Sequence, residues 1–123
     1  MGIFNKIFNS NQSNNVPWVQ LTSIEQLDKI QEESKTTPIV IFKHSTRCSI
    51  SSAALSRFSS AWNDEVGKTP YFLDLIAHRE ISSAIAEKFN VVHQSPQVIV
   101  VKNEKAIFDA SHMNINVLDI TNA

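Results

Sequence analysis

The chain has 123 residues, of which only one is cysteine and two are glycine. A single cysteine cannot form a disulfide within the chain, so the fold depends on a packed core. Two glycines are too few for a glycine-rich loop that cradles phosphate groups, which excludes the common nucleotide-binding loops. The unpaired cysteine is therefore the residue that most needs an explanation.

Charge and long apolar segments are also scarce. The formal net charge is −1, which gives no electrostatic support for binding nucleic acid. No apolar run is long enough to cross a membrane, and no segment is typical of a signal peptide. Together with the single cysteine, these features predict a cytoplasmic protein without a transmembrane segment or a nucleic-acid partner. The four histidines are scattered, and none lies at zinc-ligand spacing from Cys48, so we expect no metal site and no tightly bound cofactor.

Residues 1–15 differ in composition from the rest of the chain. Apolar residues at positions 3, 4, 7 and 8 have helical spacing, and residues 9–15 form a polar run of Asn, Ser and Gln. A polar run of this kind is typical of a flexible linker. We therefore predict an N-terminal amphipathic turn and flexible linker over residues 1–15, followed by one domain over residues 16–123.

From residue 16 onward, strand-like and helix-like segments alternate. Apolar and β-branched runs predict strands over residues 18–21, 39–43, 71–76, 98–101 and 106–109. Apolar residues at helical spacing predict helices over residues 24–30, 49–62 and 81–89. A capping box from Thr22 to Glu25 would start the first helix, and Asn90 would end the third in a left-handed conformation. Asn116 is expected to cap a brief last helix.

The order of these elements predicts the fold class. Strands that are joined through a helix run parallel with right-handed crossovers. The four-residue link over residues 102–105 allows only a hairpin. We therefore predict an α/β fold with a single mixed sheet, in which parallel βαβ units precede an antiparallel C-terminal hairpin and helices cover both faces.

Cys48 lies at the point where a predicted strand passes through a polar loop into a predicted helix. The first N–H groups of a helix have no partner within it, and their partial positive charge favours a thiolate, the nucleophilic form of cysteine. A free cysteine is more often a buried structural residue. Polar residues surround this one, however: Ser45, Thr46, Arg47, Ser49 and Ser51. This setting indicates a reactive cysteine.

The same residues carry a resemblance to a known family. An order of elements with a cysteine at the start of the second helix resembles the thioredoxin fold, and Cys48-Ser49-Ile50-Ser51 occupies the place of its redox motif in the single-thiol form Cys-x-x-Ser. Ser95-Pro96 stands where that fold has a cis-proline facing the active-site cysteine. The runs 43–51 and 94–97 are similar to those of the monothiol bacilliredoxin-like family, which are small thioredoxin-fold general stress proteins of bacillithiol-using Gram-positive bacteria. The resemblance extends over about residues 17–120.

The resemblance implies a monothiol thiol–disulfide oxidoreductase in redox or general stress response, with Cys48 as the nucleophile. Its thiolate would attack a mixed disulfide between a client protein and a small thiol, for which bacillithiol is the expected co-substrate. Because position 51 is serine, an external thiol has to regenerate Cys48. The expected partners are S-thiolated client proteins and the small thiol, and the protein is expected to act as a monomer.

Residues close to Cys48 in the sequence are candidates to support it. Arg47 and His44 could place positive charge near the sulfur, and the Ser51 hydroxyl could donate a hydrogen bond to it. An exposed loop arginine is usually only solvated, however, and a histidine at a strand end often only caps backbone groups. We therefore treat Arg47, Ser51 and His44 as supporting active-site residues whose roles need structural evidence.

Two further positions concern the client. A cis bond before Pro96 would leave the backbone of Ser95 free to pair with an extended client segment, so we expect both residues to bind substrate. The alternative is that Pro96 only begins a strand, where proline is tolerated. His112 could approach the site from a neighbouring loop, and Asp74 could accept a proton, although a surface or structural role is the commoner one for each.

Other functions remain open. Glutathione-using glutaredoxins carry Gly-Gly-x-x-Asp after the hairpin, whereas residues 108–112 contain no glycine. Iron–sulfur monothiol glutaredoxins use Cys-Gly-Phe-Ser, whereas the middle pair here is Ser49-Ile50. Both differences speak against those functions. The alternatives that remain are a non-catalytic thioredoxin-fold binding module and a bacillithiol carrier or sensor without turnover.

Overall fold

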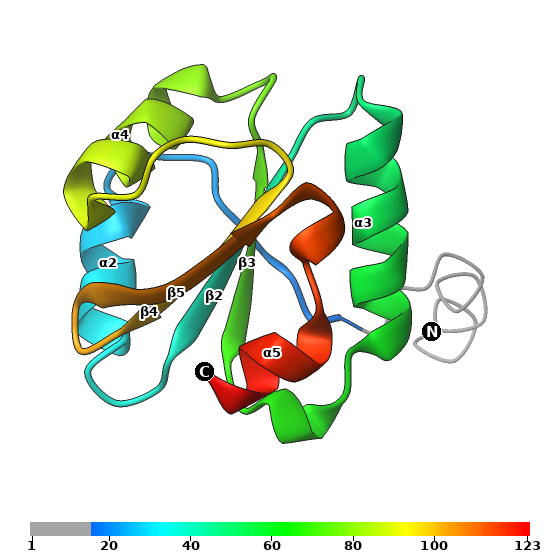
Figure 1. Ribbon diagram of the computed structural model, residues 1–123. Coiled ribbons are helices and arrows are strands. Elements are labelled where there is room, and N and C mark those ends of the chain that lie inside the picture. Colours follow the sequence, from blue (N-terminus) through cyan, green and yellow to red (C-terminus); the bar gives the residue numbers. More distant parts are fainter. Residues whose placement is uncertain (1–15) are drawn as a thin grey trace, which may run out of the picture.

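The computed structural model describes residues 16–123, and the predicted turn and linker over residues 1–15 lie outside the described residues (Figure 1). The strands are β1 (Val19–Gln20), β2 (Ile39–His44), β3 (Thr69–Asp74), β4 (Gln97–Lys102) and β5 (Lys105–Ser111). The α-helices are α2 (Gln26–Glu33), α3 (Ser49–Ala61), α4 (Arg79–Phe89) and α5 (Val117–Asn122), with 3₁₀ turns η1 (Asp64–Val66) and η2 (His112–Asn114). Over residues 16–123, none of these helices combines the length and the apolar character needed to cross a membrane.

The five strands form one mixed sheet in the order β1-β3-β2-β4-β5. The first three strands along the chain are parallel, because β3 pairs in parallel with both β1 and β2. The hairpin of β4 and β5 adds to the other edge, where β4 runs antiparallel to β2. This topology confirms the predicted α/β fold with parallel βαβ units and an antiparallel C-terminal hairpin.

Helices cover both faces of the sheet, so the protein has two cores. All six residues of β2 are buried, and they alternate between the two sides. Ile39 and Ile41 pack with residues of α2 and α4, whereas Val40 and Phe42 pack with residues of α3 and α5. Figure 1 shows the same arrangement, with α2 and α4 on one side of the strands and α3 and α5 on the other.

Strand β3 differs from the prediction, which placed it over residues 71–76. It begins at Thr69, whose N–H donates to the carbonyl oxygen of Pro38 at 3.0 Å, and it pairs with β2 from there. It ends at Asp74, because a carboxylate oxygen of that residue accepts hydrogen bonds from the N–H groups of Ile76 and Ala77. Asp74 therefore has the structural role that was considered the commoner one.

The start of α2 is also shifted. The predicted capping box from Thr22 to Glu25 is not the one that forms, because the side-chain oxygen of Gln26 accepts the N–H groups of Thr22 and Ser23 at 2.7 and 3.0 Å. The helix itself begins at Gln26. A side-chain amide three residues after Ser23 thus satisfies the free backbone donors in place of the predicted glutamate.

Candidate functional site

Cys48 is the residue immediately before α3, with an extended backbone conformation at φ −113° and ψ 121°. Its N–H donates to the carbonyl oxygen of Ser45 at 3.2 Å, and its own carbonyl oxygen accepts the N–H of Ser52 at 3.0 Å. The backbone of Cys48 is therefore held at the N-terminus of a 13-residue helix, where the helix dipole is positive. The cysteine is free and partly exposed, so a small reagent can reach it.

Ser51 fastens the loop before Cys48 to the first turn of α3. Its hydroxyl oxygen accepts the N–H of Ser45 at 3.0 Å and lies 2.7 Å from Nδ1 of His44. The Ser51 side chain is fully buried, so these contacts replace its hydrogen bonds to water. Among the contacts of the described residues, the hydroxyl makes no hydrogen bond to the Cys48 sulfur. Ser51 thus acts on the shape of the loop, which differs from the contact that we had considered.

His44 is neutral in this arrangement. Burial lowers its pKa, and the nearby carboxylate of Asp74 offsets only part of this effect. The Ser51 hydroxyl already accepts from Ser45, so its hydrogen is free to point at an unprotonated His44 Nδ1. His44 therefore completes the buried link to Ser51 and does not add a positive charge beside the sulfur.

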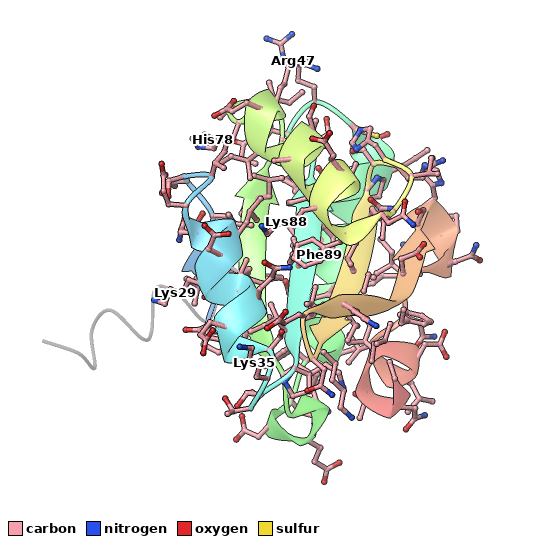
Figure 2. All side chains as sticks on the ribbon, turned by 90° about the vertical axis from the view of Figure 1, so that its left-hand side faces the viewer. Lys29, Lys35, Arg47, His78, Lys88 and Phe89 are labelled. Atoms are coloured by element: carbon pink, nitrogen blue, oxygen red, sulfur yellow. The ribbon has the colours of Figure 1, made fainter. Side chains whose placement is uncertain are left out.

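Arg47 directly precedes Cys48 but points away from the fold. Its side chain is exposed and projects outward at one end of the molecule (Figure 2). No ion pair or hydrogen bond of the Arg47 side chain occurs within residues 16–123. Its charge can therefore act on an approaching client or small thiol, with little effect on the resting loop.

The peptide bond between Ser95 and Pro96 is cis, as predicted. Gln97 follows it and pairs with Lys43 near the C-terminal end of β2, so the proline lies at the same end of the sheet as Cys48. The carbonyl oxygen of Pro96 accepts the N–H of His112 at 3.0 Å. The backbone of His112 thus lies beside the proline, whereas its side chain is exposed.

The segment before the proline is held by buried polar groups. Nε2 of Gln97 donates to the carbonyl oxygen of Val92 at 3.0 Å, and the N–H of Gln94 donates to Oε1 of Gln97 at 3.4 Å. The Ser95 hydroxyl oxygen is buried without a hydrogen-bond partner among the described residues. The pairing of β4 with β5 begins at Gln97, so Ser95 lies outside the ladder.

Sequence reasoning missed one residue of this region, Lys43. Its side chain is fully buried, and Nζ lies 2.8 Å from Nδ1 of His93. Desolvation lowers the pKa of Lys43 to about 8. The only signal in the sequence is a lysine that continues the otherwise apolar run 39–42, and the partner that explains it is 50 positions away.

The described residues do not suggest a metal centre. Within residues 16–123, no three side chains of His, Cys, Asp or Glu are grouped as ligands of one ion.

Solved structures of known proteins share this fold. A protein provisionally described as an oxidoreductase with a thioredoxin fold is 31% identical, with a TM-score of 0.74 over 86% of this chain and 94% of that one. The thioredoxin of Malassezia sympodialis is 17% identical, with a TM-score of 0.66 over 84% of this chain and 87% of that one. The thioredoxin of Trypanosoma brucei brucei is 18% identical, with a TM-score of 0.63 over 85% and 86%. At these lower identities the two thioredoxins show the fold alone.

The sequence also matches one protein family over most of its length. Residues 19–120 match the family described as monothiol bacilliredoxin BrxC, a range that includes Cys48 and the cis-proline. Together with the thioredoxin-fold oxidoreductase above, this match supports a thiol oxidoreductase. The chain belongs to the monothiol bacilliredoxin family.

Proposed function

We propose that the protein removes bacillithiol from S-thiolated client proteins, with Cys48 as the nucleophile. The observation that carries this proposal is the position of the only cysteine, which is partly exposed at the start of α3 and at the same end of the sheet as the cis-proline. The N–H groups of the first helical turn stabilise negative charge on its sulfur.

The reaction is a thiol–disulfide exchange. The Cys48 thiolate attacks the small-thiol sulfur of the mixed disulfide, a new disulfide forms between Cys48 and the small thiol, and the bond to the client breaks. The client sulfur leaves as a thiolate and takes a proton from solvent. A second small thiol, as its thiolate, then attacks the adduct, which releases the symmetrical disulfide of the small thiol and returns Cys48 as a thiolate.

The need for an external thiol follows from position 51. In a Cys-x-x-Cys motif a second thiol at this position would resolve the adduct, but Ser51 is buried and bonded to Ser45 and His44. The adduct on Cys48 therefore lasts until a small thiol from solution reaches it.

Three exposed apolar side chains lie in segments that adjoin Cys48 or the cis-proline, and they support client binding. Ile50 follows the cysteine in α3, Val92 precedes the cis-proline, and Met113 lies in η2 next to His112, and these side chains are 48%, 80% and 75% exposed. An extended client segment could cover them while its backbone pairs with the free backbone of Ser95.

The proposal is tested with a purified client that carries one bacillithiol adduct. Mass spectrometry should show the adduct moving to Cys48 and the client returning to its free thiol, and Cys48→Ser should abolish this transfer. With excess bacillithiol and a reductase for its disulfide, one protein molecule should process many clients. Transfer without turnover would instead identify a carrier or sensor, and no transfer by the wild type would identify a binding module.

The proposed place of action is the cytoplasm under oxidative stress. The test is mass spectrometry of the protein isolated from stressed cells, in which a bacillithiol adduct on Cys48 is expected. A different adduct, or none, would contradict this part of the proposal.

A further inference from the structure

A cavity of about 620 Å³ lies between α4 and the segment that leads to the cis-proline. Arg79, Ser82 and Glu87 line it from the helix, and His93 lines it from the opposite segment. Figure 2 faces this side of the molecule, with α4 in front and the segment after Phe89 beside it. The volume is in the range of small-molecule sites and is too small for a folded partner.

A buried positive charge lies behind the wall of this cavity. Lys43 is two positions after Ile41 and four after Ile39 along β2, so its side chain is directed to the same face, the α4 side of the sheet. Nζ reaches Nδ1 of His93 at 2.8 Å, and the Ser82 hydroxyl is 3.3 Å from the same nitrogen. Lys43 forms no ion pair with any carboxylate in residues 16–123. A buried ammonium without a counter-ion is costly and suggests that an anion is supplied from outside.

Lys43 also determines which proton His93 carries. An ammonium group can only donate, so Nδ1 of His93 has to accept and the ring proton lies on Nε2. Burial and the charge of Lys43 both lower the pKa of His93, which keeps the ring neutral. His93 therefore offers an Nε2–H donor at the cavity wall, with a positive charge directly behind the ring.

The remaining charges of the cavity are separated along α4. Arg79 lies one helical turn before Ser82, which contacts His93, so the two positive groups are near the same end. Glu87 lies eight positions after Arg79, about 12 Å along the helix. The positive groups therefore lie at the end of α4 that begins beside the active-site end of the sheet, away from the Glu87 carboxylate, and they suit the carboxylate of a small molecule.

We propose that this cavity binds the carboxylate end of the low-molecular-weight thiol of the exchange reaction, on His93 and Arg79, with the sulfur end directed toward Cys48. This inference rests on the proposed function, because it places the small thiol of that reaction. His93 is three residues from Pro96, at most about 10 Å of extended chain. A small molecule held at His93 can therefore extend along this segment toward the sulfur of Cys48.

Binding is tested separately from the reaction with S-methyl bacillithiol, which cannot form a disulfide. Titration into the full-length protein should shift the NMR signals of residues in α4 and 91–93. His93→Ala and Arg79→Gln should each weaken binding about tenfold or more, because each loses a charge-assisted hydrogen bond. Glu87→Gln should not weaken it, because that carboxylate lies about 12 Å along α4 from Arg79, away from the positive groups.

The control variants change similar residues outside the cavity. Gln94→Ala alters the exposed side chain next to His93, and Arg57→Gln removes an arginine from α3, on the other side of the sheet. Both should bind the S-methyl compound like the wild type. If His93→Ala and Arg79→Gln also bind it unchanged, or if Glu87→Gln weakens binding as much as they do, the inference is wrong.

Kinetics separate a failure of this inference from a failure of the proposed function. In the transfer assay, His93→Ala and Arg79→Gln should raise KM for bacillithiol in the regeneration step, while alkylation of Cys48 by iodoacetamide keeps its wild-type rate. A wild type that transfers, with variants of unchanged KM, would refute the cavity alone. A wild type that binds S-methyl bacillithiol but does not transfer would refute the proposed function alone.

Discussion

We expect Lys43 to lower the stability of the folded protein at neutral pH, because its charge is buried without a carboxylate partner in the described part of the chain. The ammonium keeps only the hydrogen bond to His93 in exchange for its lost hydration. A residue that costs stability in this way is more easily understood as part of a binding site than as part of the core.

The effect of Lys43 on stability should depend on pH. Its pKa is about 8 in the folded protein, against 10.5 for an ordinary lysine. Between these values the folded state has lost the Lys43 proton while the unfolded state keeps it, so the contribution of Lys43 to stability rises with pH. We therefore expect Lys43→Met to be more stable than the wild type below about pH 8, with a difference that shrinks toward pH 10.5.

Urea unfolding of both proteins at several pH values between 6 and 10.5 measures this difference. The other titrating groups are common to both proteins and cancel in the comparison, except for His93, whose pKa the charge of Lys43 lowers and which therefore titrates in the acidic part of this range. A Lys43→Met variant that is less stable than the wild type at pH 7 would show that the bond to His93 outweighs the burial of charge.

The structural role of Ser51 can also be tested by the stability of a variant, with an exposed serine in the same turn as the control. Ser51→Ala removes a buried hydroxyl and leaves the N–H of Ser45 and the ring of His44 without their partner. We expect a loss of about 1–3 kcal/mol in the free energy of unfolding. Ser49→Ala, which changes an exposed serine in the same turn, should stay within about 0.5 kcal/mol of the wild type. Equal stability of the two variants in urea titrations would contradict the structural role of Ser51.

At the scale of single elements, the end of α4 is determined by one residue. Asn90 has φ 57° and ψ 48°, a left-handed conformation, and the helix ends there. Asparagine and glycine adopt this conformation more easily than other residues. Asn90→Ala should therefore lower the free energy of unfolding by about 1 kcal/mol, whereas Asn90→Gly should have little effect. Thermal unfolding of both variants checks this, and an alanine variant as stable as the glycine variant would refute it.

The elements that the sequence predicted well are those determined by local signals. The apolar run of β2 and the left-handed Asn90 are both readable within a few residues. The start of β3 was not, because it depends on a hydrogen bond from Thr69 to the distant Pro38. Helical spacing does not by itself decide burial, since Ile50 in α3 is 48% exposed although it has helical spacing to core residues.

The same distinction applies to the site. Cys48 and the cis peptide before Pro96 could be placed from motifs in the chain. The link from Lys43 to His93 could not, because it joins residues 50 positions apart that only the sheet and α4 bring together. Ser51 was predicted to support the site through a hydrogen bond to the sulfur, whereas its hydroxyl contacts His44 and the N–H of Ser45, which only the folded loop brings to it.

For the whole molecule, the sheet joins two cores that have no residues in common. One lies under α2 and α4 and the other under α3 and α5, and alternate residues of β2 and β4 belong to each. Ile99, for example, packs on the first side and its neighbour Val98 on the second. Loss of packing on one side should therefore affect the strands that the other side needs.

The two tryptophans make this coupling measurable, because both lie on the α3 side. Trp18 stacks on Phe58 with ring centroids 5.4 Å apart, and the ring centroid of Trp62 lies 5.5 Å from that of Phe58.

Ile85 is fully buried on the α4 side, and Ile85→Ala should lower the free energy of unfolding by about 2–5 kcal/mol through the cavity that it leaves. Tryptophan fluorescence and far-UV circular dichroism should then report one unfolding midpoint in urea, shifted equally, although no tryptophan borders the cavity. Phe58→Ala, the matched change beside the tryptophans, should also give coincident midpoints. A fluorescence midpoint that stays at the wild-type value in Ile85→Ala would show that the two sides unfold independently.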